Sequence, residues 1–207
     1  SAGPDFTLGL KVDGSVVAYG NNNLGQCSVP LPNTGFTSVV AGGNHSLGLK
    51  SDGSIVGWGY NRWNMCIAPL PNAGYMAVAA GHGHSLGLRS DGSITAWGYD
   101  GDGQCSVPSP NTGFTAVAAG ALHSLGLKAD GSIVAWGRNQ DYYGNYIGQC
   151  DVPLPNTGFI AVEAGGDHSL GLKADGSVVA WGANNDGQCD VPPPNINITA
   201  VVASPAN

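Results

Sequence analysis

Histidine is the residue whose spacing in this chain first suggests chemistry. Four histidines occupy one position of a repeating pattern: His45, His84, His123 and His168. In the first copy Phe6 occupies that position. A ring of imidazoles near an axis could bind a metal, and His82 beside His84 makes the third copy the best candidate. However, metal ligands must converge on one point, which a wide ring does not allow. We therefore expect no metal, and we expect each imidazole to bond to the backbone of its own repeat.

Cysteine also occurs once per repeat. The five positions are Cys27, Cys66, Cys105, Cys150 and Cys189. Five is an odd number, and equivalent positions in adjacent repeats lie too far apart for a disulfide. We expect the cysteines to be small buried side chains that anchor the outer segment of each repeat. The redox compartment cannot be inferred from them.

The acidic residues do not form a catalytic pattern. The chain has one glutamate, Glu163, and five of its thirteen aspartates lie in Asp-Gly-Ser turns. Glycosidases built on five-bladed propellers need two or three carboxylates at the axis. Asp100-Gly101-Asp102 is similar to the start of a calcium loop, but the later ligands are missing. No nucleophile-elbow, phosphate-loop or zinc-protease motif is present. We predict that the protein is not an enzyme and needs no cofactor.

A single repeat accounts for the whole chain. The tripeptide Asp-Gly-Ser begins at Asp13, Asp52, Asp91, Asp130 and Asp175. The spacings are 39, 39, 39 and 45 residues, so six residues are inserted in the fourth interval. Residues 123–137 and 168–182 differ only at Ile133 and Val178. Such a period is typical of propellers and solenoids.

Each unit is predicted to contain short strands. In one copy these are residues 115–120, 124–128 and 133–137, with Asp130-Gly131 as a tight hairpin turn. Residues 26–29 could add a short outer strand, limited by Pro30. The small residues of the first strand suit an inner position near an axis. The third strand carries Trp58, Trp97, Trp136 and Trp181, which we interpret as packing residues between units.

The two ends of the chain distinguish a ring from an open stack. Residues 7–11 supply a second strand and residues 199–203 a first strand, and Ala2 and Ala203 share one repeat position. An open stack would leave exposed edges and favour modified caps. We therefore predict one all-β domain, residues 1–207, folded as a five-bladed β-propeller. The ring would be closed by pairing of the N- and C-terminal strands. We expect a monomer, and pairing with a second copy is the alternative.

The repeat resembles a known family. Residues 119–139, followed by Gly148-Gln149, carry the pattern A-G-x-x-H-S-L-G-L-K-x-D-G-S-[IV]-V-A-W-G-x-N-x-x-G-Q. This pattern is similar to the repeat of the regulator-of-chromosome-condensation family. The 39-residue spacing and the G-Q-C-x-V-P motif look more like the bacterial branch that contains β-lactamase inhibitory protein II. The resemblance covers nearly the whole chain and implies a propeller, although familiar members have seven blades. Functions in the family range from nucleotide exchange to enzyme inhibition, so it implies no single function.

Differences among the five copies indicate a functional face. In a meander, the loops after the first and third strands share one end of the sheet, and these loops vary. The loops after the first strand are residues 4–5, 43–44, 82–83, 121–122 and 166–167. The loops after the third strand are residues 21–24, 60–65, 99–102, 138–147 and 183–186. Tyrosine, tryptophan and arginine are frequent in binding hot spots. Neutral drift is the alternative, but exposed aromatic residues are disfavoured unless they are used. The predicted partner-binding residues are Tyr60, Arg62, Trp63, Tyr99, Asp100, Arg138, Tyr142, Tyr143 and Tyr146.

Charge narrows the class of partner. The net charge is -7, which disfavours nucleic acid because phosphate binding needs clustered lysine and arginine. The variable face is acidic and would favour a basic or sugar-like partner. No apolar run approaches the length of a membrane helix, and no signal peptide is recognisable. We expect no membrane partner, and we expect an extracellular or bacterial-surface location.

These observations favour a non-catalytic scaffold that recognises a protein partner through its variable loops. One alternative is a lectin-like module in which Tyr60, Trp63 and Tyr142 stack on a glycan. Another is a structural repeat domain of a larger surface protein.

Overall fold

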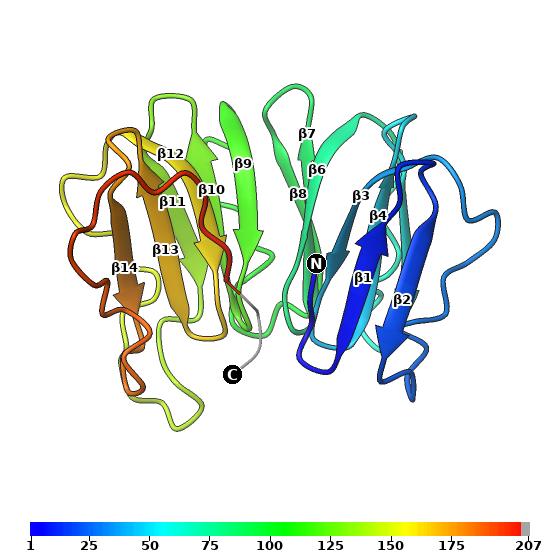
Figure 1. Ribbon diagram of the computed structural model, residues 1–207, viewed down its shortest axis with the longest axis horizontal. Helices are drawn as coiled ribbons and strands as arrows, with labels where there is room; N and C mark the ends of the chain where they lie inside the picture. The colour runs from blue at the N-terminus through cyan, green and yellow to red at the C-terminus, as the bar shows by residue number, and fades with distance from the viewer. Residues whose placement is uncertain (204–207) are drawn as a thin grey trace.

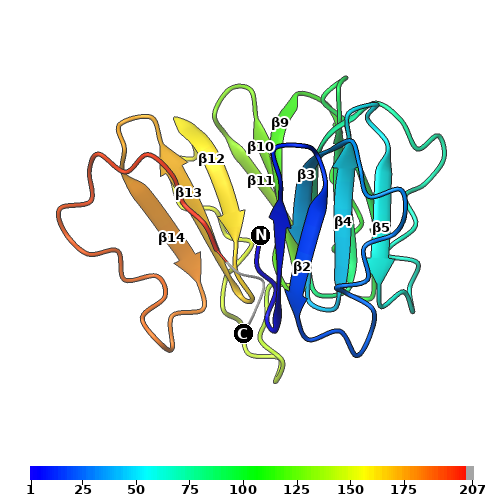
Figure 2. The same ribbon diagram turned by 45° about the vertical axis from the view of Figure 1, so that its right-hand side comes forward.

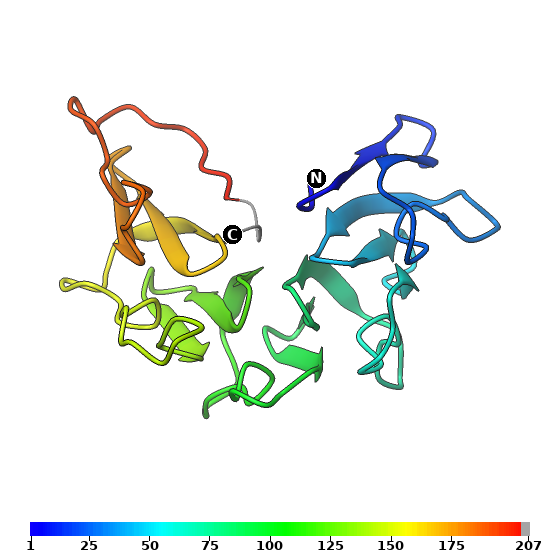
Figure 3. The ribbon, with the colours of Figure 1, turned by 90° about the horizontal axis from the view of Figure 1, so that it is seen from below.

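The structure is a computed structural model that describes residues 1–203. These residues form fourteen strands in five antiparallel sheets arranged around an axis, so the all-β five-bladed propeller is confirmed (Figure 1, Figure 3). Blade 1 contains β1 (Phe6–Leu10) and β2 (Val16–Gly20), and blade 2 contains β3 (Phe36–Ala41), β4 (His45–Lys50) and β5 (Ile55–Gly59). Blade 3 contains β6 (Tyr75–Ala80), β7 (His84–Arg89) and β8 (Ile94–Gly98). Blade 4 contains β9 (Phe114–Ala119), β10 (His123–Lys128) and β11 (Ile133–Gly137), and blade 5 contains β12 (Phe159–Ala164), β13 (His168–Lys173) and β14 (Val178–Gly182).

The recurring Asp-Gly-Ser tripeptide forms the hairpin turn between the second and third strands. In the first copy, Gly14 has φ +76°, a conformation that costs glycine little. Asp13 Oδ1 accepts bonds from Ser15 N at 2.9 Å and Ser15 Oγ at 2.6 Å. The side chain of Asn33 then bonds to both backbone groups of Val16. These contacts explain why this end of every blade keeps its sequence.

The hydrophobic core lies between consecutive blades. One cluster packs Leu86, Leu88 and Ile94 of blade 3 against Phe114 and Trp136 of blade 4. The Trp136 side chain is 6% exposed, and its Nε1 donates to Gln104 O in the preceding blade at 2.9 Å. Trp58, Trp97 and Trp181 make the equivalent bond. The prediction that these tryptophans pack between blades is confirmed.

The outer segment differs from the prediction. Residues 26 and 27 lie in a turn and residues 28 and 29 belong to no strand, and Val29 N donates to Cys27 O two residues earlier. The cysteines are half-buried and not buried as expected. Each thiol donates to a backbone carbonyl, as Cys66 Sγ does to Tyr60 O at 3.3 Å. The outer segment is thus held by these hydrogen bonds as well as by burial, since Gln26, Met65 and Gln104 are almost completely buried.

The N-terminal segment and the last described residues, which end at residue 203, lie between blades 1 and 5 (Figure 2, Figure 3). Ser1 and Ala2 fold back beside β1, where Leu8 N donates to Ser1 O at 2.9 Å and Ala2 bridges Thr7. Residues 199–203 belong to no strand. Within residues 1–203, no strand ladder joins the two ends, so closure of the ring by terminal strands stays a prediction. The same part of the chain contains no helix long and apolar enough to cross a membrane.

Candidate partner-binding face

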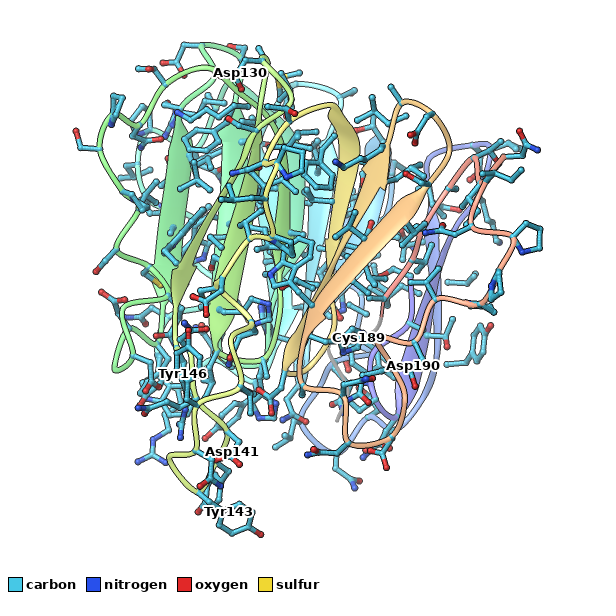
Figure 4. The ribbon with its side chains drawn as sticks, turned by 90° about the vertical axis from the view of Figure 1, so that its left-hand side faces the viewer. Asp130, Asp141, Tyr143, Tyr146, Cys189 and Asp190 are labelled. Atoms are coloured by element: carbon cyan, nitrogen blue, oxygen red, sulfur yellow. The ribbon has the colours of Figure 1, made fainter. Side chains whose placement is uncertain are left out.

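The two ends of each blade carry different chemistry. Figure 4 shows Asp130, in a hairpin turn, at one end, and Asp141, Tyr143, Tyr146 and Asp190 at the other. The loops after the first and third strands are joined by backbone bonds, for example Tyr60 N to Asn44 O at 3.0 Å and Tyr99 N to Gly83 O at 2.9 Å. The variable loops therefore share one end of the ring. We call this end the loop face and the opposite end the turn face.

A recurring polar side chain shapes each long loop of this face. Its oxygen accepts the backbone N–H of the cysteine that follows, at 2.7–2.9 Å; the acceptors are Asn22, Asn61, Asp100, Asn139 and Asn184. Asp100 also accepts from Ser106 Oγ at 3.2 Å. Asp100 was predicted as a contact residue, and in the structure its carboxylate holds the conformation of its own loop. The recurrence of Asn or Asp at this position was the signal for that role.

Four predicted residues come together across blades 2 and 3. The Trp63 ring lies 5.0 Å from the Tyr99 ring and 6.1 Å from the Tyr60 ring, between centroids. The Arg62 guanidinium lies 5.4 Å from the centre of the Trp63 ring. The Trp63 side chain remains 37% exposed. These four residues, which we call the Trp63 cluster, form an aromatic surface already held in place by its neighbours.

The six-residue insertion forms a second exposed group in blade 4. Tyr142 and Tyr143 are each 86% exposed, and their rings lie 5.7 Å apart edge to face. Asp141 orders this loop by accepting from Asn145 Nδ2 and from the N–H groups of Tyr143 and Asn145. These bonds, above all the one from the Asn145 side chain, lower the pKa of Asp141. We call residues 138–147 the tyrosine loop.

The remaining predicted residues stabilise the tyrosine loop. Arg138 donates to Gln140 O at 3.0 Å and also to Asp141 O. Its Nη1 lies 3.8 Å from Asp102 Oδ1, which links the loops of blades 3 and 4. The Tyr146 hydroxyl donates to Asp151. The structure therefore divides the predicted residues between the Trp63 cluster and the tyrosine loop, with Asp100 at the foot of a third loop.

The loop face carries most of the net negative charge. On the turn face, five lysine or arginine residues face five turn aspartates, so those charges balance. The loop face and its margins hold two arginines, Arg62 and Arg138, and eight aspartates: Asp5, Asp100, Asp102, Asp141, Asp151, Asp167, Asp186 and Asp190. Burial raises the pKa of Asp167, and Arg138 opposes that shift. The face is therefore an acidic surface with aromatic groups on it.

The histidines correct one prediction. Each of three imidazoles bonds a serine of the next blade and not the backbone of its own: His45 to Ser85, His84 to Ser124 and His123 to Ser169, at 2.9–3.0 Å. Each serine hydroxyl also bonds a carbonyl oxygen of the outer segment, as Ser85 Oγ does to Met65 O at 2.8 Å. The serine one position after each histidine was the sequence signal that we missed. A stacked ring brings these two positions together from adjacent blades.

These histidines are buried and neutral. Burial, reinforced by neighbouring imidazoles, lowers the pKa of His45 to about 4 and those of His84 and His123 to about 3. An added Cβ at Gly81 would lie 2.4 Å from His84 Cε1, so glycine is needed for the ring to fit. In the part of the chain that the structure describes, no group of three histidine, cysteine or acidic side chains could hold a metal.

A cavity of about 600 Å³ follows the axis. Alanine and valine side chains of the inner strands line it, together with Ser1, Ala203 and Glu163. Burial raises the pKa of Glu163 to about 7, although the N–H of Ala203 opposes the shift. Among the described residues that line this cavity, Glu163 is the one carboxylate, which does not match the paired carboxylates of a glycosidase.

The fold and the loop face define a repeat propeller that presents varied loops at one end. Five stretches match the model of the "Regulator of chromosome condensation (RCC1) repeat": residues 1–26, 36–62, 77–104, 114–144 and 159–188. They cover more than half of the sequence. The chain belongs to the RCC1 repeat family. Among curated proteins, none matches it by sequence.

Solved structures share this architecture. The ectodomain of the receptor kinase CR4 from Physcomitrella patens is 24% identical, with a TM-score of 0.77 over 98% of this chain and 55% of that one. The CRINKLY WD40 ectodomain of ACR4 from Arabidopsis thaliana is 26% identical, with a TM-score of 0.75 over 98% and 71%. Prp20p from Saccharomyces cerevisiae is 22% identical, with a TM-score of 0.76 over 94% and 59%. This chain thus spans between about half and seven tenths of the length of these structures.

Proposed function

We propose that this propeller is a non-catalytic scaffold that binds a protein partner through its loop face. The Trp63 cluster carries the proposal. Its rings are fixed by contact with one another, so binding would cost little side-chain entropy, while Trp63 keeps an exposed surface. Rigid aromatic groups of this kind are frequent binding hot spots.

Relatives with the same fold support a protein partner. Prp20p has binding properties toward Gsp1p and histones. Yeast RCC1 (Prp20) has also been crystallised bound to Kap60. For this chain, the finer proposal is that the partner contacts the Trp63 cluster and the tyrosine loop together. The Arg138–Asp102 ion pair joins the tyrosine loop to residues 99–102, the loop that carries Tyr99 of the Trp63 cluster.

The charge of the loop face favours a partner with a basic surface. Eight aspartates surround two arginines on this face, so a basic partner would be attracted and an acidic one repelled. Several carboxylates of this face already hold their own loops, since Asp141 accepts from Asn145 and Asp100 accepts from the N–H of Cys105. This use supports a binding role over a catalytic one.

The test compares three variants with the wild-type chain. Trp63→Ala alters the Trp63 cluster, the double change Tyr142→Ala and Tyr143→Ala alters the tyrosine loop, and Leu70→Ala is the control. Leu70 is 90% exposed and lies beside the Pro71 turn of the turn face. Proteins captured from the source cells by immobilised wild-type chain are identified, purified and titrated against each variant by calorimetry.

We expect Trp63→Ala to weaken binding at least tenfold, which is about 1.4 kcal/mol, and Leu70→Ala to leave it unchanged. The affinity should also fall as salt rises from 0.05 to about 0.5 M, because salt screens exposed charges. Equal binding by all three variants would show that the loop face is not the contact surface. Saturable binding on a glycan array that Trp63→Ala abolishes would favour the lectin-like alternative.

A further inference from the structure

The axial cavity lies toward the loop face. Each inner strand begins at the turn face, where for example Phe36 N donates to Gly14 O, and ends at the loop face, as β3 does at Ala41. The cavity of about 600 Å³ is lined mainly by the last two or three residues of the inner strands of blades 2 to 5. Sites for small molecules have volumes of about 300–1,000 Å³. The cavity is therefore large enough to hold a small organic ligand.

One residue of the cavity wall differs in charge from its counterparts in the other blades. The fifth residue of the inner strand is Val40 in β3, Ala79 in β6, Ala118 in β9 and Glu163 in β12. A half-buried carboxylate among apolar groups costs free energy when no positive charge matches it. The fold does not need this carboxylate, because three blades have an apolar side chain in its place. Glu163 is therefore a candidate for a role in binding.

No basic side chain in the described part of the chain neutralises Glu163. The lining of the cavity contains no lysine, arginine or histidine within residues 1–203, and the one ion pair found there belongs to the loop face. The Ser1 amino group lies beside the cavity but donates to Leu8 O at 3.0 Å. The N–H of Ala203 bonds the carboxylate, and the two carboxylate oxygens can accept further bonds. A bound ligand can therefore supply the positive charge that the protein lacks here.

We propose that the axial cavity binds a small organic cation, whose ammonium group faces Glu163 and whose apolar body contacts the alanine and valine walls. Glu163 sets the charge of the ligand, since it is the one carboxylate among the described lining residues. The aspartates of the loop face, at the same end of the axis, attract cations as well. The apolar walls offer too few oxygen ligands for a metal ion. The site is separate from the Trp63 cluster, so it does not depend on the proposed protein partner.

Binding at this site should depend on pH. Burial raises the pKa of Glu163 to about 7, so the carboxyl group is mostly neutral well below that pH. A bound cation favours the charged form of a neighbouring carboxyl group and lowers its pKa. The affinity for the cation should thus rise as the pH increases through about 7, and binding near that pH should release protons. Within residues 1–203, the other charged group beside the cavity is the Ser1 amino group.

An NMR titration with three matched probes tests the site. Benzylammonium, benzyl alcohol and benzoate carry the same ring and differ in charge. The backbone amide shifts of Ala79 and Ala118 report binding in the cavity, and that of Trp63 reports binding to the aromatic rings of the loop face. Glu163→Gln removes the charge and keeps the shape of the side chain. The control is Asp5→Asn, which removes one charge from an exposed position of the loop face, and thermal unfolding checks that both variants fold.

At about pH 8 we expect benzylammonium to shift the Ala79 and Ala118 amides saturably and to bind about tenfold more tightly than benzyl alcohol, while benzoate does not bind. Glu163→Gln should abolish this preference, and Asp5→Asn should keep it. The affinity of the wild-type chain for benzylammonium should fall about tenfold at about pH 5.5, and that of Glu163→Gln should not change.

Three results would overturn the inference. The first is equal affinity of the wild-type chain for benzylammonium and benzyl alcohol, which would show that the carboxylate does not select a cation. The second is a preference for the cation that survives Glu163→Gln. The third is a titration in which benzylammonium shifts only the Trp63 amide, or shifts no amide saturably, because the cavity would then hold no cation.

Discussion

The Nε2 atom of His84 lies 3.0 Å from the Oγ atom of Ser124, which is forty residues later in the sequence and belongs to the next blade. Ser124 Oγ lies 2.9 Å from Gln104 O. A carbonyl can only accept, so the hydroxyl donates its single proton to Gln104, and His84 must donate from Nε2. This chain of bonds fixes the tautomer of the imidazole and joins neighbouring blades through groups that are fully buried.

Removing the serine should destabilise the propeller. Ser124→Ala leaves the His84 Nε2–H without an acceptor in a buried site, which costs about 1–3 kcal/mol. His84→Phe should cost less, because Ser124 still bonds Gln104 and because Phe6 occupies this position in blade 1. Urea unfolding measures both. A smaller loss for Ser124→Ala than for His84→Phe would contradict the proposed proton arrangement.

Acid should destabilise the folded chain through the same histidines. Their pKa values are about 3 to 4 when folded and about 6.5 when unfolded. Between these values the unfolded chain binds more protons, so the free energy of unfolding falls as pH drops from 6.5 toward 4. The slope is at most about 1.4 kcal/mol per pH unit for each histidine. Urea unfolding across this range checks it, and His84→Phe should show a shallower slope than the wild type.

Glu163 should have the opposite effect on the pH dependence of stability from that of the histidines. Its pKa is raised by burial to about 7, so its contribution to stability is present below about pH 4.5 and is lost as pH rises through 7. Alanine fills the equivalent position at Ala79 and Ala118. We expect Glu163→Ala to stabilise the chain at pH 8 by about 1 kcal/mol, since partial exposure weakens the effect. Unchanged stability at pH 8 would place the carboxylate in water.

Replacing a tryptophan of the core should destabilise the protein more than replacing one on the loop face. Trp97 is 7% exposed and its Nε1 bonds Met65 O, so Trp97→Ala should cost about 3–5 kcal/mol. Trp63 is 37% exposed on the loop face, and Trp63→Ala should cost less than about 1.5 kcal/mol. Thermal unfolding compares them directly. A large loss for Trp63→Ala would assign that residue to the core.

Short-range features of this chain could be predicted from its sequence. The Asp-Gly-Ser turns, the alternation in residues 133–137 and the position of Trp136 depend on contacts within a few residues or on a strict period. That period also predicts stacking of similar units. The structure confirms the short-range features and the stacking. The sequence also predicted which loops share one end of the ring, because the direction of each strand in a meander determines the end at which its loop lies.

Contacts between blades depend on the three-dimensional arrangement. The sequence shows His84 and Ser124 recurring, but their meeting depends on how one blade rotates onto the next, which no local pattern encodes. For the same reason, the position of Trp63 between Tyr60 and Tyr99 and the ion pair of Arg138 with Asp102 could not be foreseen. The repeat determined which units form, and packing across their junctions decided which side chains touch.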